Sequence, residues 1–332
     1  MSVIAQQLWF RAPRDVEVRE ATLAPAAHEV LVTVHCSAVS AGTELLVYRG
    51  EVPEELALDS NIAALQQRSY PLRYGYAAVG TVSECGSAVD ASWLGRRVFA
   101  FQPHASHYVT DPANLILVPD AVSDEAAVFL ANMETAVNLV QDGAPLVGER
   151  VAVFGLGIVG LLTSALLTQF PLGALHAIDP NPQRRAEAAA LGIEIHAGNT
   201  AESRAALAEQ DFDLLFEVSG SPQALEWALA LSGYCSRLIV GSWYGNKVVN
   251  LPLGGAAHRN RLHIRTSQVS TLAPALSGRW TKERRFETAW TQLQRIEPQR
   301  WIDARLTLQE AAALYLRLDA GGETPLQALF VY

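Results

Sequence analysis

The sequence predicts an α/β protein in which a mostly β first part precedes a doubly wound parallel sheet. Three observations carry this prediction. β-Branched runs separated by turn residues occupy the first 120 positions, and strands and helices alternate from about position 150. A third is a glycine-rich turn that directly follows the first strand of the alternating region. We therefore expect two domains in this chain of 332 residues, a length at which a single core stops growing.

The first part contains three runs that favour strands. They lie at 29–36, 78–82 and 97–101, and glycine or proline residues separate them. Between the first two runs, residues 53–65 have the apolar spacing of a short amphipathic helix. This helix is either an insertion over a binding cleft or an ordinary surface helix, and the sequence does not decide between them.

The character of the chain changes at Ser123, an N-cap candidate that is followed by Asp124 and Glu125. Strands are predicted at 151–154, 174–178, 212–218 and 236–240, and helices at 158–170, 184–191 and 222–231. Strands joined by helices in this order form a parallel sheet with right-handed crossovers. After about position 280 the chain has helical pieces at 284–295 and 308–318 and an apolar end.

An acidic excess, 34 residues against 25 lysines and arginines, gives a net charge of −9 and excludes some partners. Nucleic-acid phosphates need clustered basic side chains, so no nucleic-acid partner is expected. No apolar run reaches about 18 residues and the N-terminus does not resemble a signal peptide, so we expect a cytoplasmic protein without a membrane span. The scattered Cys36, Cys85 and Cys235 suggest neither a zinc motif nor a disulfide framework.

A G-x-G-x-x-G motif between Gly155 and Gly160 predicts a dinucleotide site of the Rossmann type. It follows one predicted strand and opens a helix, which is the context that the motif requires. Gly155 allows the tight turn, Gly157 lets the backbone approach a pyrophosphate, and Gly160 lets the helix lie close to the strand. The helix begins with Ile158 and Val159, where N–H groups and the helix dipole attract phosphate. An ordinary strand-to-helix turn is the alternative.

Asp179 follows the second strand of this region and narrows the choice of cofactor. Its carboxylate can accept hydrogen bonds from the adenosine ribose and would repel a 2′-phosphate, so NAD is favoured. Arg184 and Arg185 lie close by and keep NADP open. S-Adenosylmethionine, which also contains a ribose, is a further alternative.

Several short segments together resemble the medium-chain dehydrogenase/reductase superfamily over nearly the whole chain. The segment 40–46 (SAGTELL) resembles C-G-[ST]-D-x-H of zinc alcohol dehydrogenases, and 74–80 (YGYAAVG) resembles their G-H-E-x-x-G. The segment 134–136 resembles the T-A before the cofactor fold, and 217–220 resembles the stretch beside the adenosine ribose. In part, 40–44 and the following Gly-Tyr resemble the bacteriochlorophyllide hydroxyethyl dehydrogenase group.

This resemblance implies a fold, a cofactor site and a partner. A GroES-like, mostly β catalytic domain would cover 1–122, a Rossmann domain 123–270, and a return segment 271–332 would complete the catalytic domain. The resemblance and the strand ends add the cofactor contacts Thr135, Val218, Ser219, Gly220 and Ser242. It also implies a homodimer in which the edge segment 264–270 pairs with its copy across a two-fold axis.

The family's catalytic zinc ligands are absent from the matching positions. Ala41 stands at the cysteine, Tyr76 and Ala77 at the His-Glu pair, and Ala131 at the third ligand position. Zinc needs thiolate, imidazole or carboxylate donors, and these side chains supply none. The four-cysteine zinc lobe is also missing. The chain thus resembles a zinc-free branch, and we predict no metal site.

Without zinc, a hydrogen-bond donor or proton relay must handle charge on the substrate oxygen. Thr43 matches the family's relay hydroxyl, although a threonine in a turn often bonds its own backbone. Tyr76 replaces a zinc ligand and can donate to a carbonyl, with plain aromatic lining as the alternative. His104 is a candidate acid or base, and a packing role is its alternative.

We therefore predict a zinc-independent, NAD(P)-dependent oxidoreductase that interconverts an alcohol and a carbonyl on a small molecule. The aromatic residues and the predicted helix at 53–65 favour a bulky apolar substrate. Reduction of an activated C=C bond, as in enone or quinone reductases, is one alternative. A nucleotide-binding protein without turnover is another.

Overall fold

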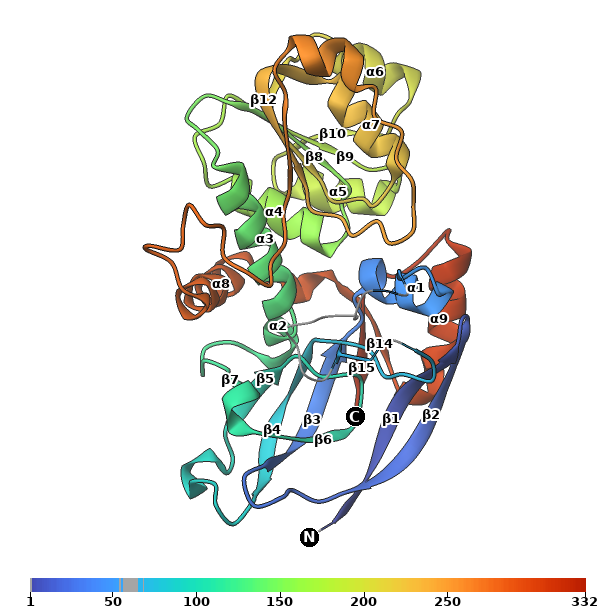
Figure 1. Ribbon diagram of the computed structural model, residues 1–332, viewed down its shortest axis with the longest axis vertical. Coiled ribbons are helices and arrows are strands. Elements are labelled where there is room, and N and C mark those ends of the chain that lie inside the picture. The colour runs from blue at the N-terminus through green and yellow to red at the C-terminus, as the bar shows by residue number, and fades with distance from the viewer. Residues whose placement is uncertain (1, 54, 56–64, 68) are drawn as a thin grey trace. The chain divides into compact units, whose positions relative to one another are not determined.

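The computed structural model describes residues 2–53, 55, 65–67 and 69–332 (Figure 1). They form two compact units: residues 1–131 with 293–332, and residues 132–292. The predicted helix at 53–65 falls mainly on 56–64, outside the described residues. In the described part of the chain, no helix combines the length and apolar character that a bilayer crossing requires.

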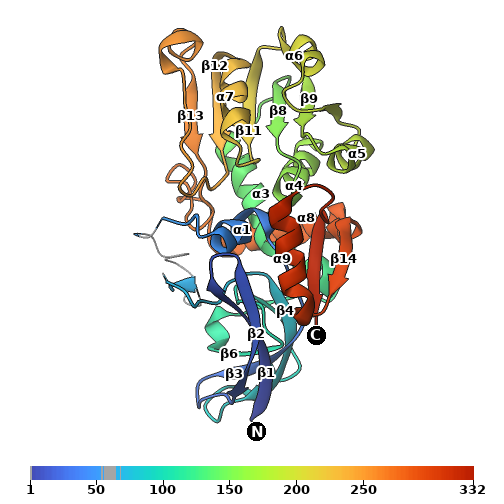
Figure 2. The same cartoon turned by 90° about the vertical axis from the view of Figure 1, so that its right-hand side faces the viewer.

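The first unit is built mostly on antiparallel strands, and β14 and β15 pair in parallel. β1 (Val3–Ala12) and β2 (Asp15–Leu23) form a two-stranded ribbon (Figure 2). The other strands form a sheet of order β14-β15-β3-β4-β5-β7, with β6 paired to β3. Their bounds are β3 Val30–Ala38, β4 Ala78–Cys85, β5 Arg97–Ala100, β6 His107–Thr110, β7 Ile116–Leu117, β14 Ile302–Leu306 and β15 Gln327–Val331. Because β15 pairs with β3, the C-terminal segment completes the sheet that the N-terminal part begins.

Three helices of the first unit matter for the site. α1 (Ala41–Arg49) ends at Gly50, whose left-handed conformation closes the helix. α2 (Asp124–Ala127) is capped by the Ser123 hydroxyl, as the sequence predicts. α9 (Ala311–Ala320) packs Tyr315 against Tyr48 of α1, with ring centroids 5.4 Å apart. This packing joins the C-terminal segment to the start of the chain.

The second unit is a parallel sheet of order β10-β9-β8-β11-β12-β13. The strands are β8 Arg150–Phe154, β9 Ala174–Ile178, β10 Glu194–His196, β11 Phe212–Glu217, β12 Ser232–Val240 and β13 His263–Thr266. The helices are α3 Leu130–Gly143, α4 Ile158–Leu167, α5 Pro182–Ala190, α6 Ala201–Leu207, α7 Pro222–Ala230 and α8 Lys282–Ile296. This is the doubly wound order, and its direction of winding reverses between β8 and β11. Ligands of such sheets bind where the winding reverses, beyond the carboxyl ends of the strands.

The boundaries of the units differ from the predicted 123 and 270 for identifiable reasons. Asp124 of α2 stays with the first unit because it bonds His35 (2.7 Å) and Arg97 (3.1 Å). Most of α8 belongs to the second unit because Arg285, which is completely buried, bonds Glu134 and Asn138 of α3. Buried ion pairs of this kind lie far apart in sequence, and no local pattern marks them.

Candidate cofactor and catalytic sites

Steric constraints fix the glycine-rich turn between β8 and α4. Gly155 has a φ of +98°, and a Cβ there would lie 2.6 Å from the Ser219 Cα. A Cβ on Gly160 would lie 1.8 Å from the carbonyl oxygen of Gly155. Both positions therefore need glycine for the backbone to close up, as the motif predicts.

Gly157 differs from these two, because a Cβ there would meet open space. Gly157 is the N-cap of α4, and no side chain caps the first N–H groups of this helix. The first helical residues, Ile158 and Val159, are partly exposed. A helix start with open space before it is suited to a phosphate group. The turn thus fits the pyrophosphate of a dinucleotide.

Asp179 lies directly after β9 and is buried. Its carboxylate accepts hydrogen bonds from the backbone N–H of Leu156 (2.7 Å) and of Asn181 (2.8 Å). The Arg184 guanidinium is 3.8 Å away. A carboxylate can accept further bonds, so a ribose contact is compatible with these two. The structure adds a role that the sequence did not predict, since Asp179 holds the glycine-rich turn in place.

A second loop, after β11, brings together four of the predicted cofactor contacts. Glu217 is completely buried and accepts from the Ser219 N–H (2.7 Å) and from the Tyr244 hydroxyl (2.7 Å). The Gly220 N–H donates to Ser242 Oγ at 2.8 Å. Val218 lies between Glu217 and Ser219 in the chain. The remaining predicted contact, Thr135, is on α3. Burial and the Glu217 charge raise the pKa of Tyr244, so this hydroxyl is a neutral anchor for the loop.

In the first unit, three hydroxyl groups gather at the start of α1. The Tyr76 hydroxyl donates to Thr43 Oγ1 at 3.4 Å and is hydrogen-bonded to Ser40 Oγ. All three residues are partly exposed. Burial of the phenol raises the pKa of Tyr76, with the bonds to Ser40 and Thr43 acting in the opposite direction. The predicted pair Thr43 and Tyr76 is thus in contact, and Ser40 is a third member that sequence reasoning missed.

The prediction for His104 needs correction. Its side chain is completely buried, and its ring nitrogens contact Ser37 Oγ (2.7 Å) and Glu44 Oε2 (3.2 Å). Glu44, also buried, accepts from the Ser40 N–H (2.7 Å) and from the Tyr315 hydroxyl, and none of the described arginines pairs with it. An enclosed imidazole with both nitrogens occupied cannot reach a substrate. His104 supports the backbone at Ser40 through Glu44, which is a positioning role.

The positions of the family's catalytic zinc ligands carry no suitable donors. Ala41, Ala77 and Ala131 have methyl side chains. Of the residues at these four positions, Tyr76 alone has an oxygen in its side chain. Its raised pKa disfavours the phenolate form that a metal would need. This donor set does not fit zinc.

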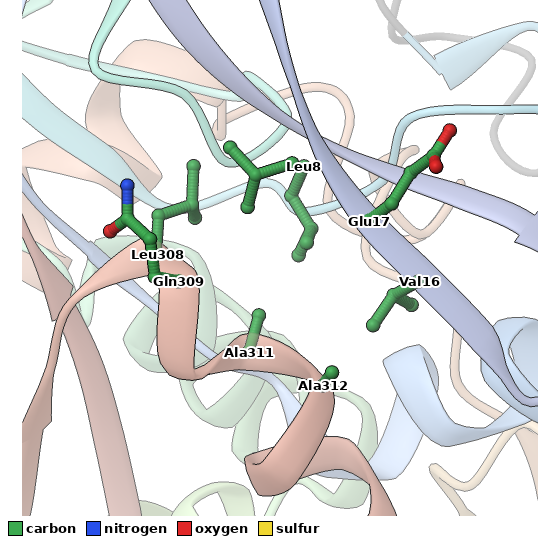
Figure 3. Close-up of a pocket in the computed structure, with 8 residues that line it drawn as sticks. Leu8, Val16, Glu17, Leu308, Gln309, Ala311 and Ala312 are labelled. Atoms are coloured by element: carbon green, nitrogen blue, oxygen red, sulfur yellow. The ribbon is translucent and has the colours of Figure 1, made fainter.

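A pocket of about 240 Å³ lies elsewhere in the first unit, between the β1–β2 ribbon and the start of α9 (Figure 3). Its apolar lining includes Leu8, Val16, Leu308 and Ala311. Its lining does not include Ser40, Thr43 or Tyr76. We assign it no part in the chemistry.

Comparisons with known proteins agree with this architecture. Residues 26–118 match the alcohol dehydrogenase GroES-like domain. D-Guloside 3-dehydrogenase of Escherichia coli K12 is 25% identical over 285 residues, which cover 80% of this chain and 81% of that protein. Two solved structures share the fold at 17% identity, each aligned over 99% of both chains: 2R,3R-butanediol dehydrogenase of Bacillus subtilis (TM-score 0.79) and an alcohol dehydrogenase of E. coli CFT073 complexed with NADH (TM-score 0.78).

A GroES-like β unit interrupted by a dinucleotide-binding unit defines a class of oxidoreductases. The matched domain and these dehydrogenase relatives support the resemblance to the medium-chain dehydrogenase/reductase superfamily that the motifs indicated.

The buried network below the hydroxyl groups predicts a large stability effect at Glu44. Glu44→Ala would leave the Tyr315 hydroxyl, His104 and the Ser40 N–H without their acceptor, and should lower the free energy of unfolding by about 3 kcal/mol. Glu44→Gln should recover part of this loss. Urea unfolding measures the effect, with Glu20→Ala on the exposed side of β2 as control, expected within about 0.5 kcal/mol of wild type. Equal midpoints for Glu44→Ala and Glu20→Ala would contradict the argument.

Proposed function

We propose that the protein is a zinc-independent, NAD(P)-dependent oxidoreductase that interconverts an alcohol and a carbonyl on a small molecule. The observation that carries the proposal is the pairing of Tyr76 with Thr43 and Ser40 where the family's zinc ligands would stand. The relatives support the reaction type, since two of them are named as D-guloside and butanediol dehydrogenases. Their names also favour a substrate with several hydroxyl groups, beside the bulky apolar one that the sequence favours.

The second unit would bind the cofactor through its backbone. The N–H groups at the start of α4 face the pyrophosphate, and Gly157 leaves the room for it. Asp179 accepts from the adenosine ribose, and Ser219 and Gly220 border the same site. When bound, NAD(P) supplies or accepts hydride at nicotinamide C4.

In the first unit, Tyr76 would act on the substrate oxygen. During carbonyl reduction its phenol donates a hydrogen bond and then a proton to that oxygen. Thr43 Oγ1 and Ser40 Oγ, both in contact with the phenol, orient it and pass a replacement proton inward from solvent. A raised pKa keeps Tyr76 protonated at neutral pH, so it is well suited as a donor and poorly suited as a base. Alcohol oxidation should therefore accelerate as pH rises toward the pKa of Tyr76.

Zinc independence rests on the donor chemistry of Ala41, Tyr76, Ala77 and Ala131. Turnover should survive treatment with a strong chelator, whereas a zinc-dependent dehydrogenase loses it. Loss of activity that added zinc restores would overturn this part of the proposal.

NAD is preferred over NADP in this proposal. The Asp179 carboxylate would repel a 2′-phosphate, and one neighbouring arginine is already engaged, since Arg185 donates to the carbonyl oxygens of Asp179 and Pro180 at 2.8 Å. Titration with NADH and NADPH compares the two directly. Tighter binding of NADPH would reverse the assignment.

Label transfer from deuterated NADH separates the proposed reaction from its alternatives. A substrate panel of glycosides, diols and bulky aromatic ketones should give a product with deuterium on a carbinol carbon. Deuterium on a carbon β to a carbonyl would identify a C=C reductase. Binding of NADH without turnover of any panel member would favour a nucleotide-binding protein.

A homodimer is also proposed. β13 is an edge strand whose four residues are all exposed, and Ile264 at its centre is 39% exposed. Unpaired edge strands pair readily with a second copy. Light scattering at micromolar concentration should give twice the chain mass of 35.9 kDa, and a monomeric mass would reject the proposal.

Gly157→Ala tests the cofactor site without disturbing the fold. The added methyl group enters open space in the free protein but meets the pyrophosphate, so NADH affinity should fall at least about tenfold. Stability should change by no more than about 1 kcal/mol, the cost of alanine at an N-cap. NADH fluorescence titration and urea unfolding measure the two quantities. Unchanged NADH affinity would place the cofactor elsewhere.

Tyr76→Phe should lower turnover about a hundredfold, because the proton donor is lost while the ring stays. Thr43→Val should have a smaller effect of the same kind, and neither change should alter NADH affinity. Tyr108→Phe is the matched control, since that buried hydroxyl has no hydrogen-bond partner among the described residues. Steady-state rates with the substrate identified in the panel are the measurement. Equal rates for Tyr76→Phe and Tyr108→Phe would remove Tyr76 from the mechanism.

A further inference from the structure

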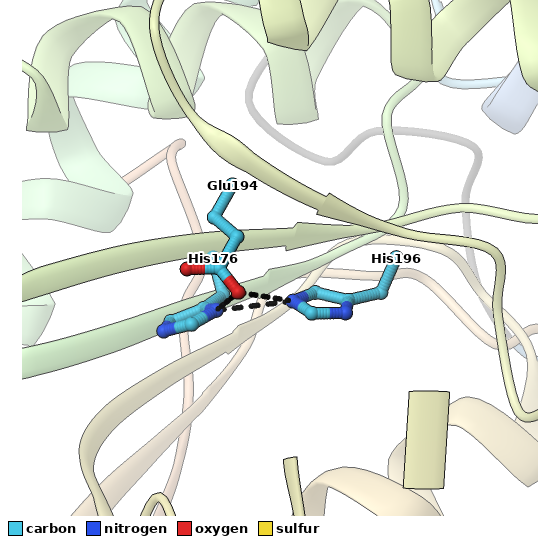
Figure 4. Close-up of side chains that lie close together, drawn as sticks. All are labelled: His176, Glu194 and His196. Carbon is cyan, nitrogen blue, oxygen red and sulfur yellow. Dashed lines mark hydrogen bonds and ion pairs between the residues drawn. The ribbon is translucent and has the colours of Figure 1, made fainter. Parts of the chain in front are cut away.

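Two neighbouring strands of the second unit place three metal-ligand side chains together (Figure 4). His176 is on β9, and Glu194 and His196 are on β10. Glu194 pairs with His176 in the parallel register, and His196 lies two residues further along the same face. All three side chains converge, so this edge of the sheet has donors of the kind that the zinc positions of the first unit lack.

The distances between the three donor atoms match a bound metal ion. His176 Nδ1 and His196 Nε2 are 3.0 Å apart, and the Glu194 Oε1 atom is 3.6 Å and 3.7 Å from them. The point equidistant from three atoms with these separations lies about 2.0 Å from each, close to the Zn–N and Zn–O bond lengths of 2.0–2.2 Å. An ion would thus need almost no movement of the side chains.

Burial prepares the two histidines for a metal. His176 and His196 are only 2% and 8% exposed, and His176 packs edge-on against Phe212. Burial lowers the pKa of both rings, although Glu194 acts in the opposite direction. Burial therefore acts against protonation of both rings, and the unprotonated imidazole is the form that binds metals.

Glu194 leaves the fourth position of the site open. It is 65% exposed, so one side of the three donors faces solvent and a water molecule can complete a tetrahedral set. Two imidazoles and a carboxylate favour zinc or a similar divalent transition metal over calcium or magnesium, which prefer oxygen ligands.

We infer that His176, Glu194 and His196 bind one divalent transition-metal ion, with zinc as the best match. This site shares no residue with the proposed proton transfer, and its residues lie apart from the family's zinc positions in the sequence. The ion would tie the short edge strand β10 to β9. It would also lie next to the cofactor site, because the Asp179 N–H donates to the His196 carbonyl oxygen at 3.2 Å. A stabilising role beside the adenosine site follows.

Calorimetric titration of the metal-free, full-length protein with zinc chloride tests the inference. Wild type should bind one equivalent, and its unfolding temperature should rise on binding. Glu194→Gln replaces an exposed ligand and should leave the fold intact. It should lower zinc affinity at least about tenfold, which is the usual effect of substitutions around metal sites. His196→Gln should do the same from the buried side.

Matched controls separate this site from incidental binding at the surface. Glu209→Gln removes an exposed carboxylate of the same unit, and His258→Gln removes an exposed imidazole. Both should bind zinc as wild type does. The inference fails if wild type binds no stoichiometric zinc, which would leave His176 and His196 as a plain hydrogen-bonded pair. It fails equally if Glu194→Gln binds zinc as tightly as wild type.

The readouts also keep this inference distinct from the proposed function. Zinc stoichiometry should follow Glu194 and His196, whereas turnover should follow Tyr76 and survive the Glu194→Gln change. Zinc that stays bound in Glu194→Gln but is required for turnover would contradict both proposals at once. Stoichiometric zinc lost in Glu194→Gln, with turnover intact, would support both.

Discussion

The hydrogen bonds of Asp179 are the constraint on which the second unit depends. Its carboxylate accepts from Leu156 inside the glycine-rich turn, and its N–H donates to the carbonyl oxygen of His196. One residue thus joins the end of β9 to the phosphate-binding turn and to the edge strand. A buried carboxylate without donors would be costly, so these bonds also explain how Asp179 is tolerated at 3% exposure.

In the first unit, a buried carboxylate plays a comparable part. Glu44 accepts from the Ser40 N–H, so it holds the start of α1, from which Ser40 and Thr43 reach Tyr76. The hydroxyl groups are at the surface of a network whose interior is His104, Ser37 and Tyr315. Hydrogen bonds thus hold the side chains that stand where the family's zinc ligands would stand.

The sequence predicted best what depends on neighbours in the chain. The strand-turn-helix around Gly155 and the N-cap at Ser123 are local patterns, and both are present. Burial of His104 depends on β15 and α9, far away in sequence, so its role could not be read from a motif. The same reason explains the place of α8, which Arg285 joins to α3 through buried bonds.

Strand register explains why the three-residue cluster escaped the sequence analysis. Glu194 and His196 alternate with Ile195, a pattern that places both on one face of a strand, but any short strand offers such pairs. Only the pairing of Glu194 with His176 brings a third donor to the same face.

Coupling between the cluster and the cofactor follows from this arrangement. An ion on His196 and a ribose on Asp179 would act on the two ends of one backbone hydrogen bond, so any effect of one on the affinity of the other would be reciprocal.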